Sequence, residues 1–153
     1  MKIKMNIKRS QLRVEEILIP DQSSDVLLPI FLESVSAGFP PPADDYLEGK
    51  LDLNKYIIRH PSSTFFVRVT GDSMTNTGIY SGDILVVDRS LIPKNGNIVI
   101  AVIDGDLVVK KLQIIKDKVY LVPENDEYDE IEITSEMHFE IWGVVTTVIH
   151  SLI

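Results

Sequence analysis

The sequence predicts a mostly β fold, a compact and curved multi-stranded domain preceded by a flexible N-terminal arm. From residue 64 onward, short β-branched and apolar segments recur at close spacing, with almost no long helical period. Three consecutive prolines at 40–42 hold an extended conformation and stop any helix that would run through them. We therefore expect an arm over residues 1–43 and a β-rich domain over residues 44–153.

Each expected element has its own signal in the sequence. The polar stretch 44–59 carries Leu47, Leu51 and Leu53, whose spacing suggests one or two helical turns. Runs rich in β-branched, aliphatic and aromatic residues predict strands at 64–70, 84–88, 98–103, 107–114, 119–122 and 141–149. Asp104-Gly105-Asp106 joins two of these strands and predicts a hairpin, because glycine accepts a positive φ.

The net charge of −8 is unevenly placed along the 153 residues. Residues 1–37 carry five basic and five acidic side chains, so the acidic excess lies wholly within residues 38–153. A body this acidic repels phosphate groups, which disfavours direct sequence-specific DNA binding and favours protein partners. No apolar run approaches the length of a membrane span or a signal peptide, so we expect a soluble, cytoplasmic protein with no membrane partner.

Composition and spacing exclude or disfavour several kinds of site. The chain has no cysteine, which excludes disulfides, thiolate metal ligands and cysteine nucleophiles. The acidic stretch 124–132 lacks the spacing of a calcium loop and is interpreted as a solvated loop. Because no zinc spacing and no phosphate-binding glycine loop occurs either, we expect no metal and no cofactor.

The most informative stretch for chemistry is Gly71-Asp72-Ser73-Met74, which directly follows the expected strand at 64–70. A turn permitted by Gly71 can present the Ser73 hydroxyl outward while neighbouring backbone N–H groups converge on one point. That is the geometry of an oxyanion hole, with Gly71, Asp72 and Met74 supporting the turn. The alternative is an ordinary Gly-Asp-Ser turn that closes a strand.

A serine nucleophile needs a base, and the sequence offers a lysine for that role. The three histidines are not flanked as in a catalytic triad and are interpreted as surface residues: His60, His138 and His150. Lys110 lies in an otherwise apolar strand and shares a face with Val108 and Leu112. Burial can lower a lysine pKa by up to about 3–5 units, enough to make a general base near neutral pH. The alternative places Lys110 in solvent at a sheet edge.

These motifs resemble the LexA/UmuD group of self-processing serine peptidases, over roughly residues 30–150. The shared motifs are Gly71-Asp72-Ser73-Met74, Gly82-Asp83, Val109-Lys110-Lys111-Leu112, Pro123-Glu124-Asn125 with Tyr128, and Trp142-Gly143-Val144-Val145. The arm resembles the UmuD branch in particular, through Ala37-Gly38-Phe39-Pro40, Ala43-Asp44-Asp45-Tyr46 and Leu51-Asp52-Leu53-Asn54. The resemblance implies a curved β domain of the LexA/UmuD type.

By this resemblance Ser73 attacks the peptide bond between Ala37 and Gly38, and Lys110 acts as its base. A RecA filament on single-stranded DNA would promote this self-cleavage during the SOS response. The trimmed product would be a homodimer that serves a UmuC-like Y-family DNA polymerase in translesion synthesis, with the replicative sliding clamp as a further candidate partner. Only 37 residues precede the bond, too few for a helix-turn-helix domain, which favours this branch over a repressor.

Two other interpretations use the same residues. In the first, the dyad is inactive and the chain is a dimeric binding module that regulates a polymerase. In the second, the chain is a LexA-like hydrolase that processes other proteins. The residues leave open whether cleavage runs within or between chains and which polymerase is the partner. They also leave open whether the gene is chromosomal or mobile, and what the basic segment 1–13 does.

Overall fold

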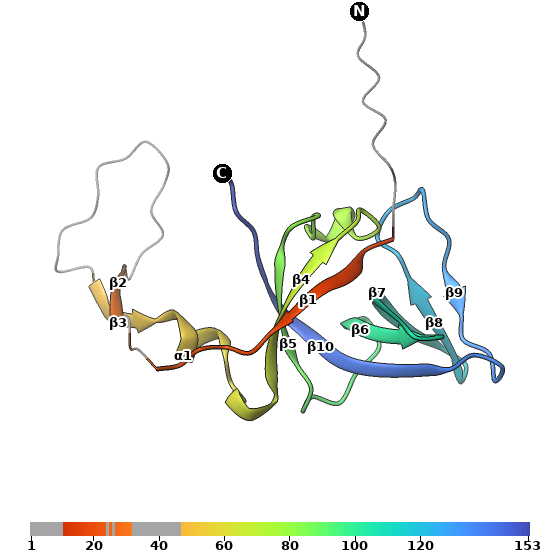
Figure 1. The fold of residues 1–153 in the computed structure, drawn as a ribbon, viewed down its shortest axis with the longest axis horizontal. Helices are drawn as coiled ribbons and strands as arrows, with labels where there is room; N and C mark the ends of the chain where they lie inside the picture. Colours follow the sequence, from red (N-terminus) through yellow and green to blue (C-terminus); the bar gives the residue numbers. More distant parts are fainter. Residues whose placement is uncertain (1–10, 24, 26, 32–46) are drawn as a thin grey trace, which may run out of the picture. The chain divides into compact units, whose positions relative to one another are not determined.

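The computed structural model describes residues 11–23, 25, 27–31 and 47–153, and its architecture is mostly β, as predicted (Figure 1). Its elements are β1 (Arg13–Leu18), β2 (Leu27–Phe31), β3 (Leu47–Asp52), α1 (Leu53–Ile57), β4 (Thr64–Thr70), β5 (Ile84–Asp88), β6 (Ile98–Ile103), β7 (Asp106–Ile115), β8 (Lys118–Val122), β9 (Ile131–Glu132) and β10 (Phe139–Ile149). Contacts divide the chain into two compact units, one formed by residues 21–59 and the other by the rest.

The smaller unit is an antiparallel hairpin of β2 and β3 followed by the single turn of α1. Asp52 caps α1, because its side chain accepts a hydrogen bond from the Asn54 N–H at 3.0 Å. The helical turn expected at Leu53 is therefore confirmed, whereas Leu47 and Leu51 lie in a strand and that part of the prediction was wrong. Pairing with β2 overrides the helical spacing, since it bonds the backbone of β3. No helix in the described part of the chain is long and apolar enough to cross a membrane.

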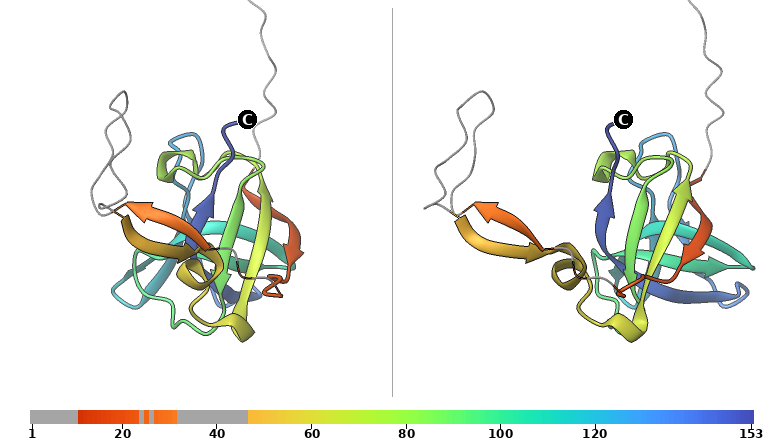
Figure 2. Two further views of the ribbon diagram at one scale, coloured as in Figure 1. Left: turned by 90° about the vertical axis from the view of Figure 1, so that its left-hand side faces the viewer. Right: turned by 60° about the vertical axis from the view of Figure 1, so that its left-hand side comes forward.

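The larger unit is a closed barrel. Its sheet has the order β1-β4-β5-β10-β6-β7-β8-β9, and β1 also pairs with β7 at Arg13 and Val108. That last pairing joins the two sides of the sheet, so that β1, β4, β5, β10, β6 and β7 form a ring of six strands (Figure 2). The ring closes through this one residue pair, so beyond Arg13 β1 is paired on its β4 side alone.

Most of the predicted strands are confirmed at their predicted positions. β4, β5 and β6 have the expected bounds, and β8 and β10 begin one and two residues earlier. β7 begins one residue earlier and ends one residue later than expected. The predicted hairpin between β6 and β7 is also present. Asp104 and Gly105 have φ values of 48° and 90°, and two successive positive values are what a tight two-residue hairpin turn requires.

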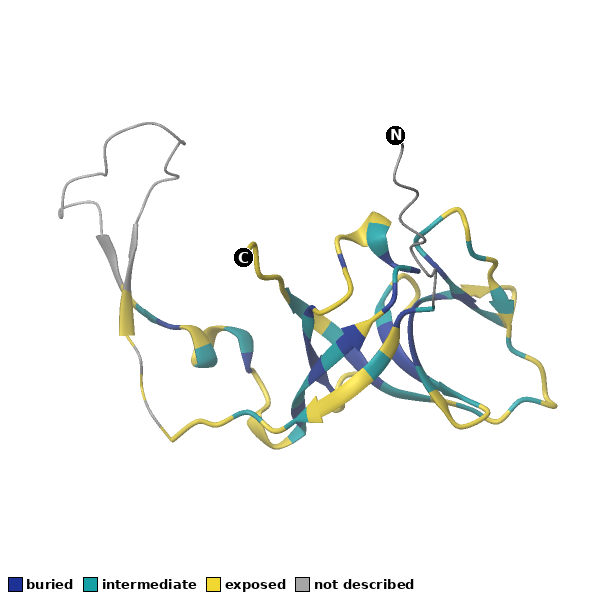
Figure 3. Ribbon diagram, turned by 45° about the horizontal axis from the view of Figure 1, so that its top comes forward, coloured by how far each residue is buried: buried dark blue, intermediate teal, exposed yellow. Residues whose placement is uncertain are grey.

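Buried residues gather on the strands of the barrel (Figure 3). Two apolar clusters form the core, and β7 contributes to both. Val109 belongs to the cluster that contains Leu12, Val69 and Met74, whereas Val108 and Leu112 belong to the second. Both faces of β7 are therefore covered at Val108 and Val109, whereas the Lys111 side chain further along is 43% exposed. Lys110 lies between Val109 and Lys111 with no exposed surface, so it needs hydrogen-bond partners in the interior.

One strand of the barrel was not expected from the sequence. Residues 13–18 fall within the range predicted to be an arm, yet they form β1, and Leu12 just before it has no exposed surface. The segment reads Arg-Val-Glu-Glu-Ile-Leu, and a bulge between Val14 and Glu16 breaks its alternation. Neither the apolar content nor the period of this segment marks it as a strand, so only its pairing with β4 and β7 reveals it.

Candidate active site

The predicted serine lies in a turn that begins as β4 ends at Thr70. Gly71 has a φ of 115°, a value that L-residues rarely adopt, so glycine is required for the chain to leave the strand in this direction. The Gly71 N–H donates a hydrogen bond to Ser81 Oγ at 3.3 Å, which ties the turn to a neighbouring loop. Ser73 and Met74 that follow have no exposed surface. The turn thus carries a serine hydroxyl into the interior.

Lys110 lies next to this hydroxyl. Its Nζ is 3.2 Å from Ser73 Oγ, and the residue has no exposed surface, which excludes the alternative of a solvent-exposed edge lysine. Burial lowers the lysine pKa from 10.5 to about 8. At pH 7 about one such side chain in ten would be a free amine, whereas an unperturbed lysine gives fewer than about one in a thousand. The structure therefore brings together a serine and a lysine that can exchange a proton near neutral pH.

The loop that follows β8 is hydrogen-bonded to the turn that carries Ser73. Asn125 Nδ2 donates to the Asp72 carbonyl at 2.8 Å, and the Glu124 N–H donates to the Ser73 carbonyl at 2.9 Å. The Tyr128 hydroxyl donates to the Asp72 carboxylate. The interpretation of residues 124–132 as a solvated loop was therefore wrong for its first part. Its acidic composition suggested solvent exposure, and only the shared Pro-Glu-Asn motif pointed to this role.

A segment near the start of the described chain also reaches the site. The Leu12 N–H donates to Ser73 Oγ at 2.8 Å, and the Leu12 carbonyl accepts from the Val109 N–H at 3.1 Å. The Gln11 side-chain oxygen accepts a hydrogen bond from Lys110 Nζ. A Cβ on Gly71 would lie 2.3 Å from the Gln11 carbonyl oxygen, so the backbones approach this closely only because Gly71 has no side chain. No local pattern in the sequence marks Gln11 and Leu12 as part of the site.

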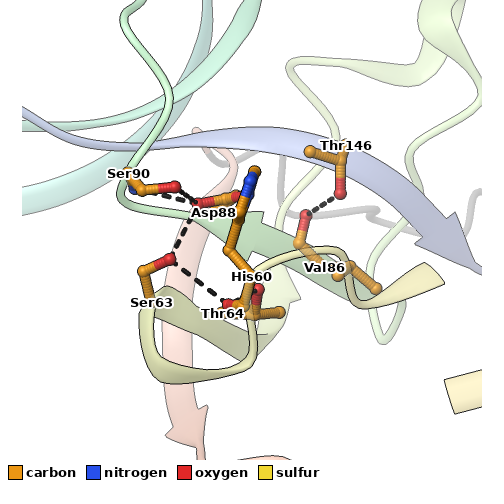
Figure 4. Close-up of polar contacts among 7 residues, drawn as sticks. All are labelled: His60, Ser63, Thr64, Val86, Asp88, Ser90 and Thr146. Carbon is orange, nitrogen blue, oxygen red and sulfur yellow. Dashed lines mark hydrogen bonds and ion pairs between the residues drawn. The ribbon is translucent and has the colours of Figure 1, made fainter. Parts of the chain in front are cut away.

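The histidines lie on the surface, as predicted, and two of them pair with buried aspartates. His60 Nδ1 is 2.5 Å from Asp88 Oδ2, and the hydroxyls of Ser63 and Ser90 donate to Asp88 Oδ1 at 3.1 and 2.6 Å (Figure 4). Burial raises the Asp88 pKa, but hydrogen bonds from Ser90, His60 and Ser63 outweigh it and lower the pKa to about 2. This cluster fastens the segment before β4 to the end of β5. The basic side chain in contact with Ser73 Oγ is that of Lys110.

The second pair lies at the other end of β5. His150 Nδ1 is 2.5 Å from Asp83 Oδ1, and the other carboxylate oxygen of Asp83 accepts from the Tyr80 N–H at 2.8 Å. His138 is exposed, and its backbone N–H donates to Asp104 Oδ1 at 3.0 Å. Within the described ranges no group of three or more His, Asp or Glu side chains could hold a metal ion. These contacts stabilise loops and strand ends.

The predicted site residues are thus partly brought together. Gly71, Asp72, Ser73 and Met74 form one turn beside Lys110, and Met74 also packs in the first core cluster. The predicted scissile bond between Ala37 and Gly38 falls outside the described residues.

Comparison with known proteins points to one family. The sequence model of the Peptidase S24-like family matches residues 29–146. Protein SamA of Salmonella typhimurium is 49% identical over 122 residues, covering 80% of this chain and 84% of SamA. Protein MucA of Escherichia coli is 45% identical over 127 residues (82% and 84%), and protein ImpA of Escherichia coli is 44% identical over 131 residues (86% and 89%).

Proposed function

This chain belongs to the Peptidase S24-like family, and from that premise we propose that it is a UmuD-type serine peptidase that cleaves itself between Ala37 and Gly38. The observation that carries the proposal is the 3.2 Å contact between Lys110 Nζ and Ser73 Oγ in a site without solvent exposure. A lysine whose pKa is lowered to about 8 by burial is a base suited to serine at physiological pH.

The reaction follows from these groups. The Ser73 Oγ–H proton passes to the free amine of Lys110 while Oγ attacks the Ala37 carbonyl carbon. Backbone N–H groups of the turn supported by Gly71, Asp72 and Met74 are the proposed donors to the oxyanion, apart from that of Gly71, which donates to Ser81 Oγ. The intermediate collapses as the Gly38 nitrogen takes the proton and leaves, so that Ala37 remains as an ester on Ser73. Water, with Lys110 again as base, then hydrolyses the ester and releases residues 1–37.

Small residues at the cut suit a buried nucleophile. Neither Ala37 nor Gly38 has a side chain that would hold an extended backbone away from Ser73, which has no exposed surface. Asn125 and Tyr128 are proposed as positioning residues, because they hold the Asp72 peptide and carboxylate and thereby fix the turn that carries Ser73.

The proposed cellular role is that of an SOS mutagenesis protein in the cytoplasm. A RecA filament on single-stranded DNA would favour the docked cleavage segment, and the homodimeric product of residues 38–153 would serve a UmuC-like Y-family DNA polymerase. The acidic excess of residues 38–153 supports contact with proteins in preference to the phosphate backbone. The similarity to SamA, MucA and ImpA over most of the chain supports placing the protein with this group.

The test is intact-mass analysis of the purified chain, incubated at neutral and alkaline pH with and without activated RecA filament. Fragments 1–37 and 38–153 are expected with RecA or at high pH. Ser73→Ala should abolish them, whereas the matched control Ser135→Ala, at an exposed position, should cleave like the wild type. A chain that stays whole in every condition would reject self-cleavage and favour a dimeric binding module. Residual cleavage by Ser73→Ala would reject Ser73 as the nucleophile.

A further inference from the structure

We propose that residues 11–18 act as an inhibitory strand, which fills the catalytic groove between β4 and β7 and must leave before the cleavage segment can enter. This inference rests on the proposed function, because it concerns access to the same Ser73 and Lys110. Residues 11–18 lie before the region that matches the family, which begins at residue 29, so the family match gives them no role.

The groove holds β1 by its backbone. On one side β1 pairs with β4 from Arg13 opposite Thr70 to Leu18 opposite Phe66, and on the other side Arg13 pairs with Val108 of β7. Backbone pairing of this kind accepts many sequences, because every extended segment presents the same N–H and C=O groups. The two edges that hold β1 would therefore offer the same hydrogen bonds to the segment around the proposed scissile bond.

The contacts of Gln11 and Leu12, the first two residues of the inhibitory strand, oppose catalysis at both reacting groups. The Leu12 N–H donates to Ser73 Oγ, so it engages an oxygen lone pair that attack on a carbonyl carbon requires. Lys110 Nζ donates to Gln11 and to Ser73, whereas a general base must accept the serine proton on its nitrogen lone pair. The covering segment thus leaves Ser73 and Lys110 in contact, but it occupies the serine lone pair and the lysine amine that the reaction needs.

The inhibitory strand is anchored in the core, so it can compete with the cleavage segment for the groove. Leu12 has no exposed surface and packs in the core cluster that contains Val69 and Met74. Gly71 lets the backbone of residues 11 and 12 lie against the turn, because any Cβ there would meet the Gln11 carbonyl at 2.3 Å and the Leu12 Cα at 2.8 Å. The groove and this segment therefore fit each other in shape as well as in hydrogen bonding.

A reversible lock tests the inference. Glu16 of β1 and Arg68 of β4 are register partners with exposed side chains in an ion pair of 3.5 Å. Residues directly opposite on antiparallel strands are within reach of a disulfide, and the chain has no cysteine of its own. The full chain with Glu16→Cys and Arg68→Cys can therefore be closed by oxidation and released by reduction. The matched control pair is Gln113→Cys with Tyr120→Cys, register partners on β7 and β8.

Self-cleavage of the oxidised and of the reduced double-cysteine chain is measured by intact mass at alkaline pH, and the two rates are compared. We expect oxidation of the Glu16–Arg68 pair to slow formation of fragment 38–153 by about tenfold or more, because the open groove becomes rare. Reduction should restore the rate, and the control pair should cleave equally in both states. In a separate variant, Gln11→Ala should speed cleavage about fivefold at neutral pH, while Glu15→Ala, exposed on the same strand, should not.

Three results would overturn the inference. The first is equal cleavage in the locked and the reduced state. The second is a product that begins at Leu12, because residues 11 and 12 would then be a substrate. The third is an unchanged cleavage rate in Gln11→Ala. A failure of the proposed function is recognised separately, by adding a peptide boronate of residues 33–37 to the locked protein. Its boron accepts an electron pair from Ser73 Oγ, so the adduct forms without any cleavage. Adduct formation only after reduction would support the inhibitory strand even in a chain that never cuts itself, and equal adduct in both states would reject it.

Discussion

Replacing Lys110 with methionine should make the protein more stable at neutral pH while abolishing its proposed activity. The pKa of Lys110 is about 8 in the folded chain and 10.5 in the unfolded chain, because burial penalises the charged form. Above pH 10.5 the amine is neutral in both states, so burial of charge costs nothing. Between pH 10.5 and 8 the unfolded chain binds more protons, and the free energy of unfolding therefore increases with pH.

Below pH 8 the penalty is complete, and the lowering of the pKa from 10.5 to about 8 corresponds to roughly 3 kcal/mol. Methionine keeps an unbranched side chain of similar length and removes the charge. It also loses the hydrogen bond from Lys110 to Gln11, which contributes about 1 kcal/mol. We therefore expect Lys110→Met to stabilise the folded state by about 2 kcal/mol at pH 6–7. The gain should vanish at about pH 10, where the remaining charge penalty equals the lost hydrogen bond, and at higher pH the variant should be less stable than the wild type.

The assay is urea unfolding at pH 6, 8 and 10 in a Ser73→Ala background, which prevents cleavage during the experiment. Lys111→Met is the matched control, since its side chain is 43% exposed in an ion pair with Glu124 and should change stability little at any pH. In the chain with Ser73 intact, the cleavage rate should rise with pH to half its maximum near pH 8, and Lys110→Met should lower it by about 10²–10⁴-fold. A stability difference that is the same at pH 6 and pH 10 would refute the account of a desolvated lysine.

Two further predictions concern residues around the site and in the Asp88 cluster. Tyr128→Phe removes the hydroxyl that donates to Asp72, so self-cleavage should slow several-fold. The free energy of unfolding, measured in urea, should fall by about 1 kcal/mol or less. An unchanged cleavage rate would exclude a positioning role for Tyr128. Asp88→Asn removes a carboxylate whose pKa is lowered from 3.8 to about 2, so it should cost roughly 2 kcal/mol at neutral pH. The wild-type chain should lose that stability as pH falls from about 4 to about 2, and thermal unfolding of Asp88→Asn should lack this loss.

Much of the barrel could be predicted because its signals are local. β4, β5 and β6 are short runs of aliphatic, aromatic and β-branched residues bounded by turn residues, and their bounds were predicted correctly. The burial of Lys110 also follows from a local pattern, since the lysine interrupts an apolar strand. The serine turn was identified from Gly71, whose positive φ explains why a glycine stands directly after a strand.

The parts that could not be predicted depend on distant partners. β1 has two glutamates at its centre, and it becomes a strand because β4 and β7 supply its hydrogen bonds. The acidic loop at 124–128 turns toward the serine because Asn125 and Tyr128 find Asp72, a contact across more than 50 residues. Leu47 and Leu51 have helical spacing, but pairing across the β2–β3 hairpin determines their conformation.

The position of β1 in the ring also has a consequence for how the protein is made. A ribosome synthesises Arg13 about 95 residues before Val108, its partner on β7, and at about 5–20 residues per second this interval lasts about 5–20 s. Closing a ring through such a distant contact is slow compared with forming the hairpins within it. We therefore expect the barrel of the newborn chain to close last along the seam between β1 and β7. Until then the edge of β7 near Val108 lacks its partner and is open to pairing with other strands, whereas the second half of β7 can already pair with β8.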